Sequence, residues 1–203
     1  MTVSTRRKVL KGLGVAAPVV WVTPVVTSVV LPAHAQTTTP EEEPEPAPQM
    51  FAIGDTGPGG GIVFYLEPGS DGTMGLEAAT ADQSTAAQWG CFFPVDVTGA
   101  TGTAIGTGAL NTQAILDENC TDTPDAAMAA ANVGPGWFLP SVDELNAMYT
   151  ELHLNGLGGI AGGSYWSSSQ SSADDARNHD FFDGVQRVFD KNFTLRVRAV
   201  RAF

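Results

Sequence analysis

Residues 164–203 read SYWSSSQSSADDARNHDFFDGVQRVFDKNFTLRVRAVRAF, and this C-terminal stretch carries most of the information about the fold. Beyond the first 35 residues the chain has no lysine or arginine before Arg177, so all six later basic residues lie in this stretch. Asp183-Gly184 is a dipeptide favoured in two-residue type I′ turns, and it predicts a β-hairpin. Asp190 to Asn192 predicts a second turn, followed by a final strand over residues 193–199.

The predicted hairpin places its side chains on two faces, because successive side chains of a strand alternate. A two-residue loop sets Phe182 opposite Val185, Asp180 opposite Arg187 and Asn178 opposite Phe189, all on one face. The other face holds His179, Phe181, Gln186 and Val188. From the pattern alone we expect the more apolar face to be buried, since buried apolar faces outnumber exposed ones.

Residues 1–35 have the features of an export signal. Arg6 and Arg7 precede a moderately apolar run that ends in Ala33-His34-Ala35, a small-residue cleavage pattern. Paired arginines at this position predict the twin-arginine route across the bacterial inner membrane. An uncleaved anchor is the alternative, and two prolines in the apolar run argue against it. We expect an exported protein that is periplasmic, secreted or displayed at the cell surface, with no membrane insertion after signal removal.

Residues 36–49 hold four glutamates and four prolines without a large apolar side chain, which predicts a disordered linker. Residues 50–203 then form one α+β domain, large enough for a core. All 22 acidic residues lie beyond the leader, where only six basic residues remain, so the mature chain carries a formal charge of −16. Such a charge repels phosphate groups, and we expect no nucleic-acid partner.

A glycine-rich segment, residues 54–61, lies between two short apolar runs at 51–53 and 62–66. This pattern predicts a hairpin with a wide loop. The segment lacks the Gly-Lys-Ser/Thr ending of a phosphate-binding loop and opens no helix, so we expect tight turns and no cofactor.

Three helices are expected. The first covers residues 111–118. The second covers 125–132, with Thr123 as N-cap, Pro124 at its first position and Gly134 past its end. The third begins at the capping box formed by Ser141 and Glu144 and extends to about residue 155.

Cys91 and Cys120 are the only cysteines, and in an exported protein this pair predicts a disulfide. On the chain-entropy model, closing this loop stabilises the fold by about 3.5 kcal/mol. A catalytic thiol or a metal pair is the alternative, but only His153 and His179 follow the leader, which disfavours zinc.

Four aspartates of the tail are candidate calcium ligands: Asp174, Asp175, Asp180 and Asp183. We expect them to be solvated carboxylates instead, with no bound metal. We also expect Arg196 and Arg198 to form a solvated strand face paired to nearby carboxylates. Trp89, Trp137 and Trp166 are expected in the core.

Five segments together resemble the domain that ends bacterial collagen-like adhesins, the Lcl C-terminal-like family. They are GDTGPGGGIVFY (54–65), GTAIGTGALNTQAIL (102–116), GWFLPSVDELNAMY (136–149), YWSSSQ (165–170) and KN-T--VRAVRAF (191–203). The resemblance covers residues 50–203. It implies a C-type-lectin-like fold, with two helices packed on small antiparallel sheets and the chain's end paired back into a sheet. Such a fold does not by itself fix a function.

The tail is also similar to the variable segments of proteins diversified by retroelements, in which adenine-specific mutagenesis rewrites Asn codons. In such segments a fixed scaffold matches Tyr165, Trp166, Ser167, Ser168, Ser169, Ala176, Phe181, Gly184, Lys191 and Val197 to Phe203. The resemblance implies that Phe181 is buried and that a ligand-binding surface lies between the scaffold positions. Arg177 departs from the pattern, because relatives often hold an aromatic residue there. The surface comprises Asp174, Asp175, Arg177, His179, Asp180, Phe182, Asp183, Val185, Arg187, Phe189 and Phe193.

These observations favour an exported, non-catalytic binding protein that recognises a macromolecular ligand, with a protein preferred to a glycan. One alternative is an adhesin-like lectin that holds glycans through Trp166 and polar loops. A second is an enzyme of the sulfatase-modifying type, whose chemistry requires a close cysteine pair with copper.

Overall fold

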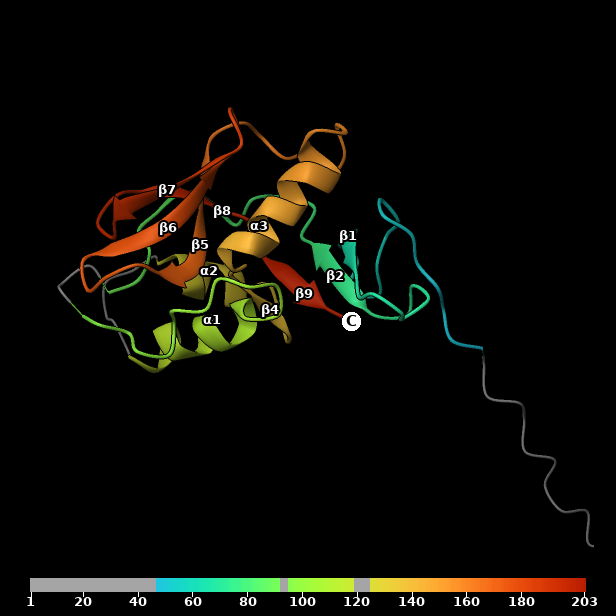
Figure 1. Cartoon of the computed structure of the whole chain (residues 1–203), viewed down its shortest axis with the longest axis horizontal. Helices are drawn as coiled ribbons and strands as arrows, with labels where there is room; N and C mark the ends of the chain where they lie inside the picture. The colour runs from blue at the N-terminus through green and yellow to red at the C-terminus, as the bar shows by residue number, and fades with distance from the viewer. Residues whose placement is uncertain (1–46, 92–94, 119–124) are drawn as a thin grey trace, which may run out of the picture. The chain divides into compact units, whose positions relative to one another are not determined.

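The computed structural model describes residues 47–91, 95–118 and 125–203 (Figure 1). The predicted signal with Arg6 and Arg7, most of the predicted linker, and Cys120 lie outside these residues. The described chain is an α+β domain built from short helices and two small sheets. The predicted class is therefore confirmed, while the likeness to C-type lectins stays a prediction.

The first sheet is antiparallel and has the strand order β1-β2-β9-β4. Its strands are β1 (Ile62–Leu66), β2 (Gly75–Ala78), β9 (Val200–Ala202) and β4 (Trp137–Phe138). The last strand of the chain, β9, is an inner strand of this sheet and lies between β2 and β4 (Figure 1). The end of the chain therefore pairs back into a sheet, as the family resemblance implies.

The second sheet has the order β3-β8-β5-β6-β7 and is antiparallel except where β5 meets β8. Its strands are β3 (Ser84–Ala87), β8 (Leu195–Val197), β5 (Ser164–Gln170), β6 (Asp175–Asp180) and β7 (Val185–Asp190). The prediction of one final strand over 193–199 is wrong. The chain leaves this sheet after β8, passes through Arg198 and Ala199, and enters the first sheet as β9.

Three α-helices are present in the described residues: α1 (Gly108–Asp117), α2 (Ala126–Ala131) and α3 (Val142–Met148). The capping box at Ser141 and Glu144 is confirmed, and α3 continues into a π-helical turn, η1 (Tyr149–His153). The predicted N-cap of the second helix is wrong. Asp125 caps α2 by accepting a hydrogen bond from the Met128 N–H at 2.6 Å, whereas Thr123 and Pro124 lie outside the described residues.

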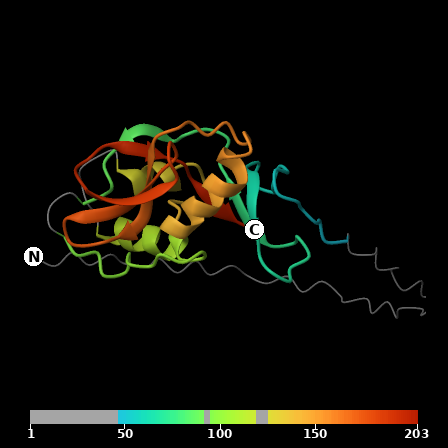
Figure 2. The ribbon, with the colours of Figure 1, turned by 45° about the horizontal axis from the view of Figure 1, so that its top comes forward.

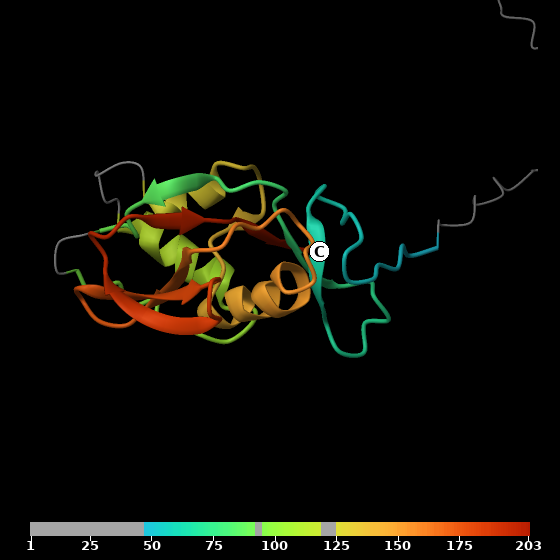
Figure 3. The same ribbon diagram turned by 90° about the horizontal axis from the view of Figure 1, so that it is seen from above.

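Two clusters of buried side chains form the core. The first surrounds Trp89 and Trp166 and includes the small residues of α2. Figure 2 shows α3, in orange, between the orange-red strands β6 and β7 and the green strands of the first sheet. The second surrounds Phe64, Leu145 and Phe181. Helix α3 contacts β1 of one sheet and β5 and β6 of the other, and it therefore joins the two sheets (Figure 3).

The glycine-rich segment wraps around the buried carboxylate of Glu77. This carboxylate accepts hydrogen bonds from the N–H groups of Gly59 and Gly61, both at 2.8 Å. The predicted tight turns are present, but the predicted hairpin with residues 51–53 is wrong. Phe51 instead donates its N–H to Gly72 O and packs its ring on Phe203, at 5.0 Å between centroids. The chain pairs with β1 in the next residues instead: the Gly54 N–H donates to Val63 O at 2.8 Å, and Thr56 forms an antiparallel bridge with Ile62.

In the part of the chain that the structure describes, no helix has the length and apolar character needed to cross a membrane.

Candidate binding surface

The terminal hairpin pairs β6 with β7 through a four-residue turn, residues 181–184. The predicted two-residue loop is wrong: Asp180 lies opposite Val185, and Asn178 lies opposite Arg187. The backbone of the turn is closed by the Gly184 N–H, which donates to Asp180 O at 2.8 Å. Asp-Gly thus fills the last two positions of a longer turn, and Gly184 takes the left-handed conformation, at φ +74°.

Carboxylates fix the shape of this turn. The Asp180 side chain accepts the Phe182 N–H at 2.9 Å, and the Asp183 side chain accepts the Val185 N–H at 3.1 Å. The first bond satisfies the Phe182 N–H, which lies in the turn beyond the last pair of the ladder. The short acidic side chains therefore stabilise the longer loop that the sequence pattern alone did not predict.

Phe181 anchors the turn to the core, as the resemblance implies. Its side chain is 1% exposed, and its ring lies 4.8 Å from that of Tyr165 and 5.2 Å from that of Tyr149. Tyr149 also supports the turn from below, since a Cβ added at Gly184 would lie 2.7 Å from its ring. The turn is held in place by buried aromatic contacts.

Phe182, the next residue, points the other way and is 81% exposed. One edge of its ring lies over Gly162, where an added Cβ would approach to 2.8 Å. Val185 is also exposed, at 46%. The exposure expected for these two residues from the second resemblance is confirmed, and the expectation that the more apolar hairpin face is buried is wrong for them.

Phe189 differs from the expectation of a solvent-facing side chain. It is half-buried and packs against the core cluster around Trp166. Its ring lies 5.5 Å from that of Phe193, which is 54% exposed. Phe193 and the outer side of Phe189 therefore form one aromatic surface, whose inner side belongs to the core.

The charged groups of the turn pair with one another, one arginine with two carboxylates. Arg187 forms ion pairs with Asp183 and with Asp180, the latter at 3.1 Å. The hydrogen bond from Arg187 holds the pKa of Asp183 below its ordinary value, and the pKa of Arg187 is raised in turn. The predicted Asp180–Arg187 pair is confirmed as an ion pair, although the two residues are not opposite each other in the ladder. Arg187 and Asp183 lie at the surface, where such pairs contribute little to stability.

His179 is not on the surface, which corrects its assignment to the binding residues. It is fully buried between the rings of Tyr149 and Phe181, at 5.1 and 5.2 Å, and neither ring nitrogen makes a well-aligned hydrogen bond within the described residues, although the Gly184 backbone lies close by. Burial lowers the pKa of His179, while the nearby carboxylates of Asp180 and Asp183 oppose this effect. Helix α3 and η1 cover this face of β6, and that cover is not visible in the local sequence.

The rest of β6 shows the same lack of polar partners. The side-chain amide of Asn178 is buried, and no described residue bonds to either of its polar atoms or to the Nε of the half-buried Arg177. Asp174 is exposed and Asp175 half-buried, and Ser172 donates to Asp175 at 3.0 Å. Within the described residues, no group of three or more His, Cys, Asp or Glu side chains is placed to hold a metal ion.

Two buried cations hold the tail to the rest of the domain, and sequence reasoning missed the role of both. The Lys191 Nζ donates to the carbonyls of Val95 and Ala173 and to Gln170 Oε1, at 2.7–2.9 Å, and lies 4.7 Å from the Trp89 ring. Burial lowers the pKa of Lys191 to about 8. Three acceptors match the three donors of its ammonium group, so Lys191 is a fully satisfied structural contact.

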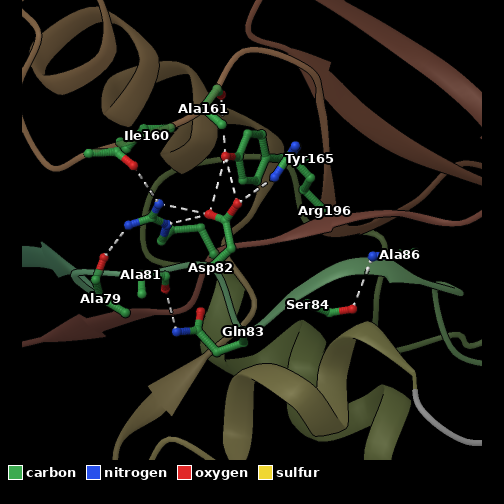
Figure 4. Close-up of polar contacts among 12 residues, drawn as sticks. Ala79, Ala81, Asp82, Gln83, Ser84, Ala86, Ile160, Ala161, Tyr165 and Arg196 are labelled. Carbon is green, nitrogen blue, oxygen red and sulfur yellow. Dashed lines mark hydrogen bonds and ion pairs between the residues drawn. The ribbon is translucent and has the colours of Figure 1, made fainter.

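Arg198 is the second buried cation, and its predicted exposure is wrong. It is 1% exposed and pairs with Asp82 at 2.7 Å, while the more exposed Arg196 contacts the same carboxylate at 2.9 Å (Figure 4). The Tyr165 hydroxyl also donates to Asp82, and burial, followed by the charge of Asp82, raises the pKa of Tyr165 to about 12. The local sequence around Arg198, with Val197 before it and Ala199 after it, gives no signal of burial, because Asp82 lies more than a hundred residues earlier.

The three tryptophans of the described chain belong to the core, as predicted, with Trp89 and Trp166 fully buried and Trp137 partly so. The Trp166 indole N–H donates to Ala87 O at 2.9 Å. A role for Trp166 in holding glycans is therefore excluded by its position. Cys91 is buried, and the described residues contain no free cysteine. Its proposed partner Cys120 lies outside the described residues, so that pairing stays a prediction.

A search with models of known families finds no match to this sequence. None of the curated proteins matches it either. One solved structure that is similar to the domain is the crystal structure of a fimbrial protein from Bacteroides ovatus ATCC 8483. It has 16% sequence identity and a TM-score of 0.48, and the alignment covers 70% of this chain and 44% of that one. The chain thus spans less than half of that protein, and no functional conclusion is drawn from a similarity at this level.

Proposed function

We propose that this chain is an exported, non-catalytic binding protein that uses its terminal hairpin to recognise a macromolecular ligand. The observation that carries the proposal is the position of Phe182. This large apolar side chain is 81% exposed, although the turn that bears it is fixed by buried contacts of Phe181. A rigidly held and exposed aromatic residue is the type of anchor that dominates binding energy at protein interfaces.

The surface around Phe182 supports the same function. We define the hairpin surface as the exposed or half-exposed residues Phe182, Val185, Phe189 and Phe193. Such a group of apolar side chains with carboxylates nearby is typical of interaction sites on otherwise polar proteins. A protein ligand is favoured because glycan recognition normally uses exposed polar groups around an aromatic platform, and Trp166 is buried.

We further propose that the hairpin surface is diversified by a retroelement, as the second resemblance implies. The scaffold positions Tyr165, Trp166, Phe181 and Lys191 are fully buried, whereas most intervening positions are exposed or half-exposed. This distribution supports the proposal, with His179 as the exception. Sequencing the neighbouring DNA tests it. We expect a reverse transcriptase gene nearby, together with a near-copy of the 3′ end of this protein's gene that differs from it at adenines. Neither is expected if the hairpin surface is not diversified by a retroelement.

The binding function is tested on arrays of bacterial surface proteins and of glycans. We expect the intact chain to bind members of the protein array and the Phe182→Ser variant to lose that signal. A matched control is Leu110→Ser, which removes another exposed apolar side chain on α1, outside the hairpin surface. Binding that survives Phe182→Ser but is lost in Leu110→Ser contradicts the proposal, and so does a signal confined to glycans.

A further inference from the structure

The outer strand of the hairpin has an uncovered edge. Strand β7 is the last strand in the order β3-β8-β5-β6-β7, and no strand among the described residues pairs with its other side. Figures 1 and 3 show β6 and β7 at the end of the domain opposite to β1 and β2. The opposite edge strand of the same sheet, β3, is partly covered. Gln88, the residue after β3, forms a bridge with Asp125 at the start of α2.

The ladder register shows which backbone groups lie on this edge. The Lys191 N–H donates to Asp174 O at 2.9 Å, in line with the pairing of β7 and β6. Since hydrogen-bonded residues alternate in an antiparallel pair, the N–H and C=O groups of Arg187 and Phe189 point to β6. Those of Gln186 and Val188 point outward, and no strand within residues 47–91, 95–118 and 125–203 bonds to them.

Natural proteins usually protect such an edge with proline, lysine or a bulge. Strand β7 contains neither residue, and its register with β6 is continuous over six pairs. Its one basic residue, Arg187, is engaged by Asp180 and Asp183. The edge is therefore regular enough to accept a further strand.

The side chains beside the edge indicate the chemistry of that strand. Val185 is 46% exposed on one face and Val188 is 44% exposed on the other, so apolar side chains of a partner find contacts on both faces. The charges nearby are acidic on balance: Asp174 is exposed and Asp190 half-exposed, the Arg187 group carries one excess carboxylate, and Arg177, opposite Val188 in the ladder, is a half-buried cation. A second copy of this domain, with a formal charge near −12, is repelled, whereas a segment with basic flanks is attracted.

We propose that the ligand of the hairpin surface is a polypeptide segment in extended conformation that pairs with β7 through Gln186 and Val188. This inference rests on the proposed function and gives it a partner class. Main-chain hydrogen bonds to the β7 edge hold the segment, its apolar side chains contact Val185 and Val188, and basic residues at its ends face the carboxylates. Glycans offer no such regular row of amide donors and carbonyl acceptors.

The test uses short random peptides displayed on phage and selected on the intact chain. The tightest peptides are synthesised and measured in solution against the wild type, Val188→Ala and Val188→Pro. Proline removes the outward N–H, which an edge position tolerates, while alanine removes the side chain and keeps the donor. We expect Val188→Pro to weaken binding by about tenfold or more, the effect of one lost main-chain hydrogen bond, and Val188→Ala by clearly less.

A second measurement covers the case in which Val188→Pro does not fold. N-methylation of alternate amides of the selected peptide is expected to abolish binding for one set of positions and to spare the other, since only one set faces β7. Equal effects of both sets, or of proline and alanine, overturn the inference. So does a dimer of the protein alone that Val188→Pro dissociates, because the edge is then occupied by a second copy.

The Phe182→Ser variant separates this inference from the proposed function. Peptides that lose binding with Phe182→Ser but not with Val188→Pro or N-methylation leave the function intact and overturn only the strand pairing. If none of Phe182→Ser, Val188→Pro and N-methylation weakens the binding of the selected peptides, both the proposed function and the strand pairing are contradicted.

Discussion

Phe181 and Phe182 are adjacent in the chain and have opposite environments: the first is 1% exposed and the second 81%. The four-residue turn makes this possible, because it places one ring against Tyr165 and Tyr149 and the other over Gly162. One residue fixes the hairpin to the core, and its neighbour remains available for contact with a ligand.

This relationship predicts different effects of the same type of change. Phe181→Ala should lower the free energy of unfolding by about 3–5 kcal/mol, as expected for truncation of a buried phenylalanine. Phe182→Ser should change the melting temperature by less than about 2 °C, because it removes few packing contacts. Denaturant unfolding of both variants beside the wild type measures this. Comparable losses in the two variants contradict the assignment of Phe182 to the surface.

The second prediction concerns the buried imidazole of His179. His179→Phe should raise the free energy of unfolding by about 1 kcal/mol, because carbon replaces, at similar volume, two buried nitrogens that make no well-aligned hydrogen bond within the described residues. Equilibrium denaturation at pH 7.5 measures the change. A loss of stability instead shows that the imidazole has a partner, such as an ordered water.

The same residue makes stability depend on pH. Burial lowers the pKa of His179, so below about pH 6.5, the ordinary value, the unfolded state takes up the proton more readily than the native state. Stability should therefore fall as the pH drops from about 6.5 and continue to fall until the lowered pKa is passed. Denaturation midpoints of wild type and His179→Phe between pH 7.5 and 4.5 isolate this contribution, which the variant should lack. If the stability of the two proteins falls in parallel as the pH drops, His179 is not the source of this pH dependence.

The fourth prediction concerns the carboxylate that joins Arg196, Arg198 and Tyr165. Asp82→Asn leaves the buried charge of Arg198 without its counter-ion, and removal of one partner of a buried pair costs about 3–5 kcal/mol. Arg196→Gln is the control, because Arg196 is a third exposed and its pair should contribute no more than about 1 kcal/mol. Denaturant unfolding measures both variants. If they lose similar amounts of the free energy of unfolding, the burial of Arg198 does not determine the effect of removing the Asp82 charge.

The fifth prediction concerns the amine of Lys191. Its pKa is lowered to about 8, so between about pH 8 and 10.5 the unfolded state holds a proton that the native state has lost. Stability should rise with pH over this window relative to a Lys191→Met variant. That variant should also be less stable at pH 7 by about 1–3 kcal/mol, since three acceptors lose their donor. Unfolding curves across this pH range measure both effects, and an identical pH dependence of the two proteins is the contrary result.

The sequence by itself determined the features that depend on local chemistry. The capping box at Ser141 and Glu144 was recognisable because both partners lie within one helical turn. The faces of β6 and β7 were mostly assigned correctly although the register was wrong by two residues, since a shift of two keeps the alternation of a strand. The α+β class also followed from short apolar runs and capped helical segments.

Only the tertiary structure decided which side chains are buried where distant segments meet. Arg198 is buried because Asp82, far back in the chain, reaches its guanidinium, and His179 is buried because η1 covers β6. Phe189 is half-buried because its strand passes over the core around Trp166. None of these contacts leaves a local signal, since each depends on how the sheet and helices pack. The surface left over by that packing, around Phe182 and the edge of β7, is the part of the protein that remains free for a partner.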